Sequence, residues 1–292
     1  METFDYLRVD TLPQALAALA QYGDGARPLC GGTDLIVQLR ENRRKAQVVL
    51  DIKPIPELNE VSFDPDSGLT LGAAVSCARL AKEPVLLRRY PGLLDAATLI
   101  GGTQIQSRAS LGGNLCNASP AADSIPALIV HQAVALIAGA NGARELPVAQ
   151  FCLAPGRTAL QPGELLVALR LPPPPARFGA AYLRFIPRNE MDLAVAGVGA
   201  AVILSEDGAS FEEVRLALAA VAPTPLVVEG AGTKLKGMAV NDRSIQLAAE
   251  LASAAARPID DVRGKARQRI HLCGVLTRRA LTIAIERARK EI

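Results

Sequence analysis

Three pairs of adjacent glycines are the residues of this chain best suited to binding chemistry. The pairs are Gly31-Gly32, Gly101-Gly102 and Gly112-Gly113, and each is followed by a small polar residue. Without a Cβ, the backbone adopts positive φ and brings its N–H groups close to a bulky anion. The pairs therefore favour a diphosphate site, although tight turns between strands are the alternative for any single pair.

The first pair has the clearest structural context. Gly31-Gly32 follows a short apolar run and precedes a predicted helix, for which Thr33 or Asp34 is a natural N-cap. The free N–H groups of such a first turn bind anions. The sequence contains no G-x-G-x-x-G. We therefore expect a dinucleotide held by separate loops, and not a Rossmann fold.

Further motifs are distributed along the rest of the chain. Besides Leu29 to Leu35 and Thr98 to Asp123, they are Pro155-Gly-Arg-Thr-Ala-Leu160, Pro162-Gly-Glu-Leu-Leu166, Tyr182 to Ala194, Asp261-Val-Arg-Gly264 and Leu276-Thr-Arg-Arg-Ala-Leu281. On these residues the chain resembles the FAD-binding medium subunit of the molybdenum hydroxylases. That family includes bacterial carbon monoxide, xanthine, nicotinate and aldehyde dehydrogenases.

The resemblance implies an α+β architecture in two domains. Residues 1–173 would form an FAD-binding domain of the vanillyl-alcohol-oxidase/PCMH type, with subdomains of about 1–55 and 56–173. Residues 174–292 would form a C-terminal flavoprotein domain with a three-stranded sheet and helices. The flavin would lie between the two subdomains, and the C-terminal domain would close over it.

The resemblance also implies a set of flavin-binding residues. Two loops would supply backbone donors to the diphosphate, helped by the Ser110 hydroxyl and the Asn114 amide. Ile100 and Leu160 would lie near the flavin, Asp123 would accept hydrogen bonds from the ribose or its neighbourhood, and Arg184 would place a positive charge near the ring. The full set is Pro28, Leu29, Cys30, Gly31, Gly32, Thr33, Asp34, Leu35, Ile100, Gly101, Ser110, Leu111, Gly112, Gly113, Asn114, Asp123, Leu160 and Arg184.

Two departures from the family pattern are visible. The family's usual Ser and Tyr in the stretch Arg263 to Ile270 are replaced by Lys265 and Gln268, so the role of that stretch is open. The cysteine-rich insertion that houses an extra cluster in 4-hydroxybenzoyl-CoA reductase is missing, because Cys116 runs directly into Asn-Ala-Ser-Pro. We therefore expect no 4Fe–4S cluster.

Composition narrows the class of protein. Aromatic residues make up 3% of the 292 residues and the net charge is +3, which argues against a nucleic-acid surface built on stacked rings. The five cysteines are isolated and include no C-x-x-C, so no zinc or iron–sulfur spacing is present and a reducing cytoplasm is expected. No signal peptide and no uninterrupted run of eighteen apolar residues is found.

The elements that must position the glycine loops can be read coarsely. A helix capped at Thr11, a strand ending at Cys30, a helix over 34–40 and a strand over 48–52 give a β-α-β unit. The middle region reads as a strand over 69–73, helices over 76–82, 85–99 and 124–131, and strands over 133–138 and 164–171. After the proline run 172–175 come strands over 182–186, 193–204 and 213–222, then helices over 226–236, 244–255 and 273–290.

No set of residues indicates catalysis by this chain itself. His131 and His271 lie far apart and outside the glycine motifs, so a hydrolase triad or a histidyl-linked flavin has little support. We expect noncovalent FAD, and a small 2Fe–2S subunit and a large molybdopterin subunit as partners. Electrons would pass from FAD to NAD⁺, a quinone or O₂. The alternatives are a stand-alone FAD oxidoreductase and a scaffold subunit whose flavin site has decayed.

Overall fold

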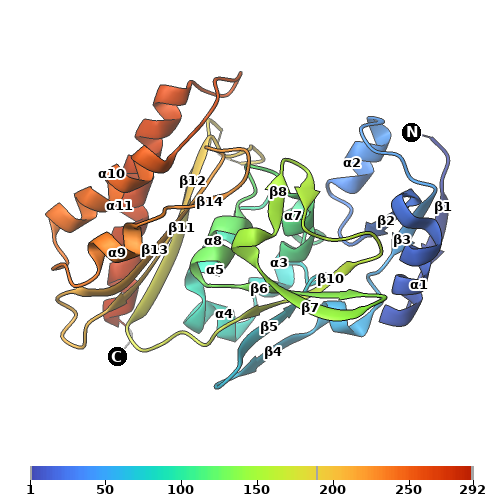
Figure 1. Cartoon of the computed structure of the whole chain (residues 1–292), viewed down its shortest axis with the longest axis horizontal. Coiled ribbons are helices and arrows are strands. Elements are labelled where there is room, and N and C mark those ends of the chain that lie inside the picture. Colours follow the sequence, from blue (N-terminus) through green and yellow to red (C-terminus); the bar gives the residue numbers. More distant parts are fainter. Residues whose placement is uncertain (1, 189, 291–292) are drawn as a thin grey trace.

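The chain folds into three units that lie in a row (Figure 1). The computed structural model describes residues 2–188 and 190–290, so Asn189 of the motif Tyr182 to Ala194 lies outside the described residues. The expected α+β class is confirmed, because a parallel sheet, an antiparallel sheet and helices occupy separate parts of the chain. No helix in the described ranges has the length and apolarity needed to cross a bilayer.

The N-terminal unit is a three-stranded parallel sheet in the order β1-β3-β2. Its elements are β1 (Asp5–Arg8), α1 (Leu12–Tyr22), the 3-10 turn Gly23–Gly25, β2 (Ala26–Leu29), α2 (Leu35–Arg40) and β3 (Val48–Asp51). The expected β-α-β unit is confirmed as β2-α2-β3, and Thr11 caps α1 as its spacing indicates. Strand β1 was not predicted, because all four of its residues are exposed and show no apolar pattern.

The middle unit contains a five-stranded antiparallel sheet in the order β4-β5-β10-β6-β7. The strands are β4 (Val61–Asp64), β5 (Gly68–Gly72), β6 (Val134–Gly139), β7 (Gly142–Pro147) and β10 (Leu165–Leu171), with a small hairpin of β8 (Cys152–Ala154) and β9 (Arg157–Thr158). The helices are α3 (Cys77–Leu80), α4 (Pro84–Arg89), α5 (Pro91–Ala97), α6 (Thr103–Gln106), α7 (Leu111–Asn117) and α8 (Ser124–Val130), with the 3-10 turns Pro56–Asn59 and Val148–Gln150.

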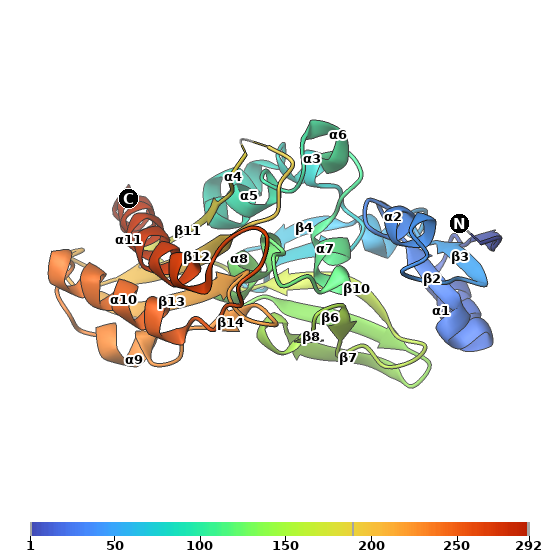
Figure 2. The same cartoon turned by 90° about the horizontal axis from the view of Figure 1, so that it is seen from above.

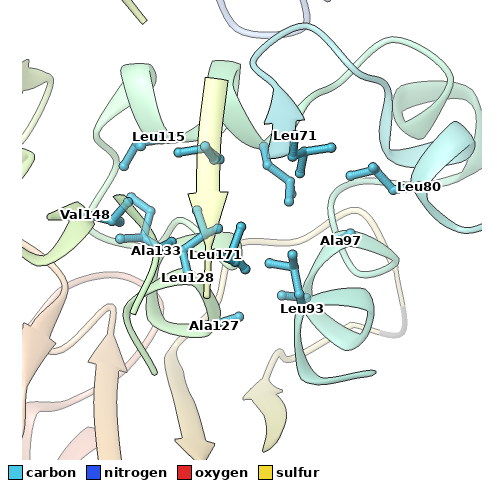
Figure 3. Packing of buried hydrophobic residues seen from close by; sticks show 14 of the residues in the cluster. Leu71, Leu80, Leu93, Ala97, Leu115, Ala127, Leu128, Ala133, Val148 and Leu171 are labelled. Carbon is cyan, nitrogen blue, oxygen red and sulfur yellow. The ribbon is translucent and has the colours of Figure 1, made fainter. Parts of the chain in front are cut away.

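The core of the middle unit joins its sheet to its helices. Figure 3 shows side chains of β5 and β10, such as Leu71 and Leu171, converging with Leu93 of α5, Leu115 of α7 and Leu128 of α8. All of these are almost completely buried. Burial of apolar area of this kind is the main stabilising term in a fold, and here it fixes the helices that carry the second glycine segment.

Two helix predictions for the middle unit need correction. The single helix expected over 85–99 is two helices, α4 and α5, because Pro91 has no N–H to continue α4 and Tyr90 before it leaves the helical region. The segment around the second and third glycine pairs, for which the sequence predicted no helix, contains α6 and α7. Its glycines concealed this helical content.

The C-terminal unit is a sheet covered by helices on one face. Its elements are β11 (Phe178–Phe185), β12 (Ala196–Leu204), β13 (Phe211–Ala219), β14 (Leu226–Val227), α9 (Ala231–Leu235), α10 (Asp242–Ala255) and α11 (Ala266–Lys290). Helices α10 and α11 lie on the outer face of this sheet, while α5 and α8 of the middle unit lie on the other (Figures 1 and 2).

The expected three-stranded sheet has four strands, in the order β11-β12-β13-β14. The helix expected over 226–236 was wrong in its first half, because Leu226–Val227 pairs with β13 as an edge strand. The helix α9 begins only after Gly230, which has a φ of 77°. Helix α11 also begins earlier than expected, at Ala266 and not at Cys273.

Several polar contacts join the C-terminal unit to the middle unit, and one of them anchors α11. The guanidinium of Arg287 in α11 binds the carboxylate of Asp95 in α5 through two hydrogen bonds of 2.6 and 2.9 Å. The same guanidinium donates to the carbonyl of Ala180 in β11 at 2.7 Å. Bidentate pairs of this geometry are the strongest ion pairs in proteins, so this contact helps to fix α11 and β11 against α5.

Candidate functional site

A cavity of about 400 Å³ lies between the N-terminal unit and the middle unit. A volume of this order is typical of a cofactor site. Thirteen of the predicted site residues line it: Pro28, Cys30, Gly31, Gly32, Thr33, Asp34, Leu35, Ile100, Ser110, Gly112, Gly113, Asn114 and Leu160. The two glycine segments, which are far apart in the sequence, therefore meet in one place.

The first glycine segment connects β2 to α2 and presents a row of backbone donors. The N–H groups of Gly32, Thr33, Asp34 and Leu35 have no acceptor within the described residues. Gly32 has a φ of 76°, which explains the need for glycine at this turn. The side chain of Asp34 occupies the N-cap position but makes no capping hydrogen bond. The expected side-chain cap is therefore absent here, and the donors stay free for another acceptor.

The second glycine segment forms the first turn of α7. The Ser110 hydroxyl caps this helix by accepting a hydrogen bond from the N–H of Gly113 at 3.0 Å. A Cβ on Gly112 would lie 2.5 Å from the carbonyl oxygen of Ala73, so Gly112 is required for packing. A Cβ on Gly113 would meet the Ser110 hydroxyl at 3.0 Å and the Cβ of Cys30 at 4.0 Å, and it would come near no backbone atom. Gly113 is therefore the glycine whose missing side chain leaves room for a ligand.

The two segments are held together by direct contacts. A Cβ on Gly31 would clash with the backbone carbonyl of Arg108, so the loops touch there. The amide of Gln38 in α2 donates to Oδ1 of Asn117 in α7 at 2.9 Å. The two helix starts are thus fixed relative to one another, which preorganises the donors.

Five predicted residues lie outside the cavity lining, and three of them are Leu29, Leu111 and Gly101. Leu29 and Leu111 are buried in hydrophobic clusters, where their side chains serve packing. Gly101 has a φ of 61° and forms a turn, and its neighbour Gly102 faces the sulfur of Met191 in the loop after β11. Of the 100–102 segment, only Ile100 reaches the cavity.

Asp123 and Arg184 form a second, buried cluster outside the cavity lining. Arg184 Nη1 and Asp123 Oδ2 are 2.5 Å apart, and the hydroxyl of Tyr182 donates to Asp123 Oδ1 at 2.8 Å. Only 5% of the Arg184 side chain is exposed. Burial raises the pKa of Asp123 to about 6, against the opposing effect of Arg184, so the carboxyl is ionised at neutral pH.

Sequence reasoning missed most of the polar side chains of the cavity. Those with a charge are Asp24, Arg27, Arg44 and Glu164. Gln38, Asn117, Thr158 and Gln161 complete the polar lining. Thr158 and Glu164 lie in two of the motifs quoted above, but the others belong to no recognisable local pattern, and all of them converge from both units only in the folded chain.

The site is suited to binding and not to acid–base or nucleophilic chemistry. Its lining contains no histidine, tyrosine or other aromatic residue among the described residues. Burial raises the pKa of the Cys30 thiol to about 11, so it is protonated at neutral pH and a poor nucleophile. His131 lies elsewhere, where its ring is tilted against Tyr90 and packs edge to face with Phe178. What the cavity offers is free backbone donors, small residues and two guanidinium groups.

Comparison with known proteins identifies the family. The family model for the FAD binding domain in molybdopterin dehydrogenase matches residues 2–174, and that for the CO dehydrogenase flavoprotein C-terminal domain matches residues 181–284. The chain is 33% identical over 288 residues to the carbon monoxide dehydrogenase medium chain of Afipia carboxidovorans, with 98% of each chain covered. It is 31% identical over 284 residues to the xanthine dehydrogenase FAD-binding subunit of Escherichia coli O157:H7, covering 97% of this chain and 96% of that protein.

Solved structures agree with these sequence relatives. The reconstituted CO dehydrogenase from Oligotropha carboxidovorans contains a chain that superposes with a TM-score of 0.93 at 31% identity, covering 98% of this chain and 99% of that one. Quinoline 2-oxidoreductase from Pseudomonas putida 86 gives a TM-score of 0.90 at 25% identity, covering 98% of both chains. The chain therefore belongs to the family of FAD-binding medium subunits of the xanthine dehydrogenase and CO dehydrogenase type, whose members are components of oxidoreductases.

Proposed function

We propose that this chain binds FAD noncovalently in the cavity between its first two units. The observation that carries the proposal is the row of free N–H groups over Gly32 to Leu35 facing the same cavity as the open side of Gly113. Free backbone donors bind phosphate oxygens, and a missing Cβ lets a diphosphate approach the backbone. The residues of the cavity thus fit the group that the family implies.

Individual residues take separate parts in this proposal. The segments Pro28 to Leu35 and Ser110 to Asn114 would hold the diphosphate, and Ile100 and Leu160 would contact the flavin. The ion pair of Asp123 and Arg184 would act from beside the cavity by fixing β11 against the start of α8. When bound, FAD supplies the ability to exchange electrons singly or in pairs, and the protein supplies position and electrostatics.

We further propose that the chain is the electron-transfer subunit of a molybdenum hydroxylase. Its relatives are medium chains and FAD-binding subunits of dehydrogenases, and one similar solved structure is a CO dehydrogenase described as lacking the Mo-pyranopterin moiety of its cofactor. A small 2Fe–2S subunit would deliver electrons, and a large molybdopterin subunit would oxidise the substrate. NAD⁺, a quinone or O₂ would accept the electrons. The complex would work in the cytoplasm, and the domain limit would lie near residue 173.

A stand-alone FAD oxidoreductase is the second candidate. It would need a substrate pocket with an acid or base beside the flavin. The described lining of the cavity offers no histidine or tyrosine, and its Glu164 is paired with Arg144 at 2.7 Å. Burial raises the pKa of both of its cysteines, Cys30 and Cys116, so their thiols are protonated. These features favour the electron-transfer role, and the free donors argue against a scaffold subunit without flavin.

The cofactor of the purified chain tests the proposal. After expression and purification, the protein should carry a yellow cofactor that heat or acid releases, and chromatography should identify it as FAD. The stoichiometry should approach one FAD for each chain. Release of FMN, a colour that stays with the denatured protein, or a colourless protein that takes up no added FAD would each contradict the proposal.

A further inference from the structure

Two arginines line the same cavity, and neither belongs to a glycine loop. Arg27 lies in β2, and Arg44 lies in the segment between α2 and β3. Nε of Arg27 donates to the backbone carbonyl of Lys45 at 3.0 Å, which holds its guanidinium beside the segment that carries Arg44. Both guanidinium groups line the cavity, and they lie near enough for the charge of Arg44 to act on Arg27.

Neither guanidinium has a carboxylate partner within 4.0 Å among the described residues, whereas both neighbours of Arg44 do. Arg43 pairs with Glu41 at 2.6 Å, and Lys45 pairs with Glu2 at 2.7 Å. Arg43 and Lys45 are exposed, but Arg44 is half-buried and turned toward the cavity. Within this basic run, Arg44 is thus distinguished from its neighbours by both orientation and lack of a counter-charge.

Arg44 also reaches across the cavity to the middle unit. Its Nη2 lies 3.4 Å from the carbonyl oxygen of Gly156, at the tip of the β8-β9 hairpin. A hydrogen bond of this length to a neutral carbonyl is weak and leaves most of the guanidinium donors free. The Arg44 side chain is consequently held over the site, where most of its guanidinium donors remain available to a ligand.

The charges around the pair leave a net attraction for an anion. Burial, and next the neighbouring Arg44, lower the pKa of Arg27, while Asp24 opposes this effect. Arginine nevertheless remains charged at neutral pH. Glu164 is neutralised by Arg144, and burial raises the pKa of Asp34, which disfavours its charged form. Two like charges held close together without a counter-ion repel one another, and an anion bound between them relieves the repulsion.

We propose that Arg27 and Arg44 bind phosphate oxygens of the cofactor, with Arg44 as the direct side-chain contact. This inference rests on the proposed FAD function and adds a charged component to a site otherwise built from backbone donors. It assigns to Arg44 a preference for phosphorylated ligands over riboflavin. A guanidinium binds phosphate through charge-assisted hydrogen bonds, whose strength falls with salt.

The test compares ligand affinities of flavin-free protein at several NaCl concentrations. Arg44→Gln should weaken FAD binding about tenfold at low salt, the effect of losing one charge-assisted hydrogen bond, and should flatten the dependence of affinity on salt. Arg44→Lys should recover most of the affinity, because it restores the charge. Arg43→Gln is the matched control, since it removes a neighbouring guanidinium that is already paired with Glu41. This variant should change neither the FAD affinity nor its dependence on salt. ADP, which shares the diphosphate, should respond to Arg44→Gln as FAD does, and riboflavin should not.

The outcomes separate this inference from the proposed function. If the unaltered chain binds no FAD, the proposed function fails. If it binds FAD and Arg44→Gln leaves both affinity and salt dependence unchanged, only the role of Arg44 fails. A loss that is equal for FAD and riboflavin, or one that leaves the salt dependence as in the unaltered chain, would show that Arg44 acts only through its contact with Gly156. A thermal melt of each variant checks that the fold is retained.

Discussion

His131 provides a quantitative prediction about stability and pH. Its ring is buried at the junction of the middle and C-terminal units, where Nδ1 bonds the carbonyl of Ala127 at 2.7 Å and Nε2 has no hydrogen-bond partner among the described residues. Burial lowers the pKa of His131 from 6.5 to about 4, although the bond to Ala127 and Asp95 oppose the effect and Arg215 and Arg287 add to it. The folded state therefore binds a proton less readily than the unfolded state.

The sign and size of the effect follow from this difference. Because the folded pKa is lowered, the contribution of His131 to stability falls as the pH decreases from about 6.5 toward 4. Linkage gives a loss of about 2 kcal/mol between pH 7.5 and pH 5. Asp123 acts in the opposite direction, because its raised pKa of about 6 adds stability over a similar range. The pH dependence of the whole protein is therefore a poor test of His131 alone.

A comparison of the unaltered chain with one variant isolates the contribution of His131 to the pH dependence of stability. His131→Asn removes the titrating ring and keeps a side-chain donor near the position of Nδ1. Urea unfolding followed by circular dichroism should show the unaltered chain losing about 2 kcal/mol relative to this variant between pH 7.5 and pH 5. Because the chain has only two histidines, the variant also assigns the His131 ring signal in NMR spectra. A difference in stability that does not change with pH, or a His131 signal that titrates near pH 6.5, would show that burial does not lower the pKa of His131.

The remaining predictions concern the cavity. Gly113→Val should abolish FAD retention with little loss of thermal stability, because the new side chain points into the open space beside Ser110. Full FAD occupancy in this variant would show that the diphosphate does not lie beside Gly113. Gly112→Ala should instead lower the melting temperature, because its Cβ would lie 2.5 Å from the carbonyl of Ala73, and an unchanged melt would contradict that packing argument. Ser110→Ala should weaken FAD binding by about 1 kcal/mol, the net value of one hydrogen bond, since Gly113 loses its capping acceptor. Equilibrium titration with FAD measures this change, and a loss of all binding would mean that the hydroxyl has a larger role.

Much of the fold could be predicted where local signals agree with tertiary structure. The β2-α2-β3 unit follows from an apolar strand, a glycine turn and a helix, and its two strands pair with one another. The prediction failed where tertiary contacts decide. Leu226–Val227 is a strand because it pairs with β13, and β1 is a strand because it pairs with β3, although neither sequence signals this.

The candidate site, like the fold, could be predicted from the sequence only in part. Glycine motifs located both backbone segments of the cavity, because a missing Cβ is visible in the sequence. Arg27, Arg44 and Asp24 could not be located, since their position depends on how the two units face one another. Sequence patterns also could not reveal that Asp123 and Arg184 bind one another in a buried pair. That contact joins α8 to β11 across 61 residues of chain.

Electron transfer between subunits tests the central claim most directly. The FAD-loaded chain would be mixed under anaerobic conditions with the small 2Fe–2S subunit proposed as its partner, which would be reduced beforehand and freed of excess reductant. We expect the flavin absorbance to bleach while the oxidised iron–sulfur absorbance returns, and the Gly113→Val variant without flavin to give no such change. The chain alone should oxidise no aldehyde or heterocycle. Absence of electron transfer in the mixture, together with substrate turnover by the isolated chain, would contradict the electron-transfer role.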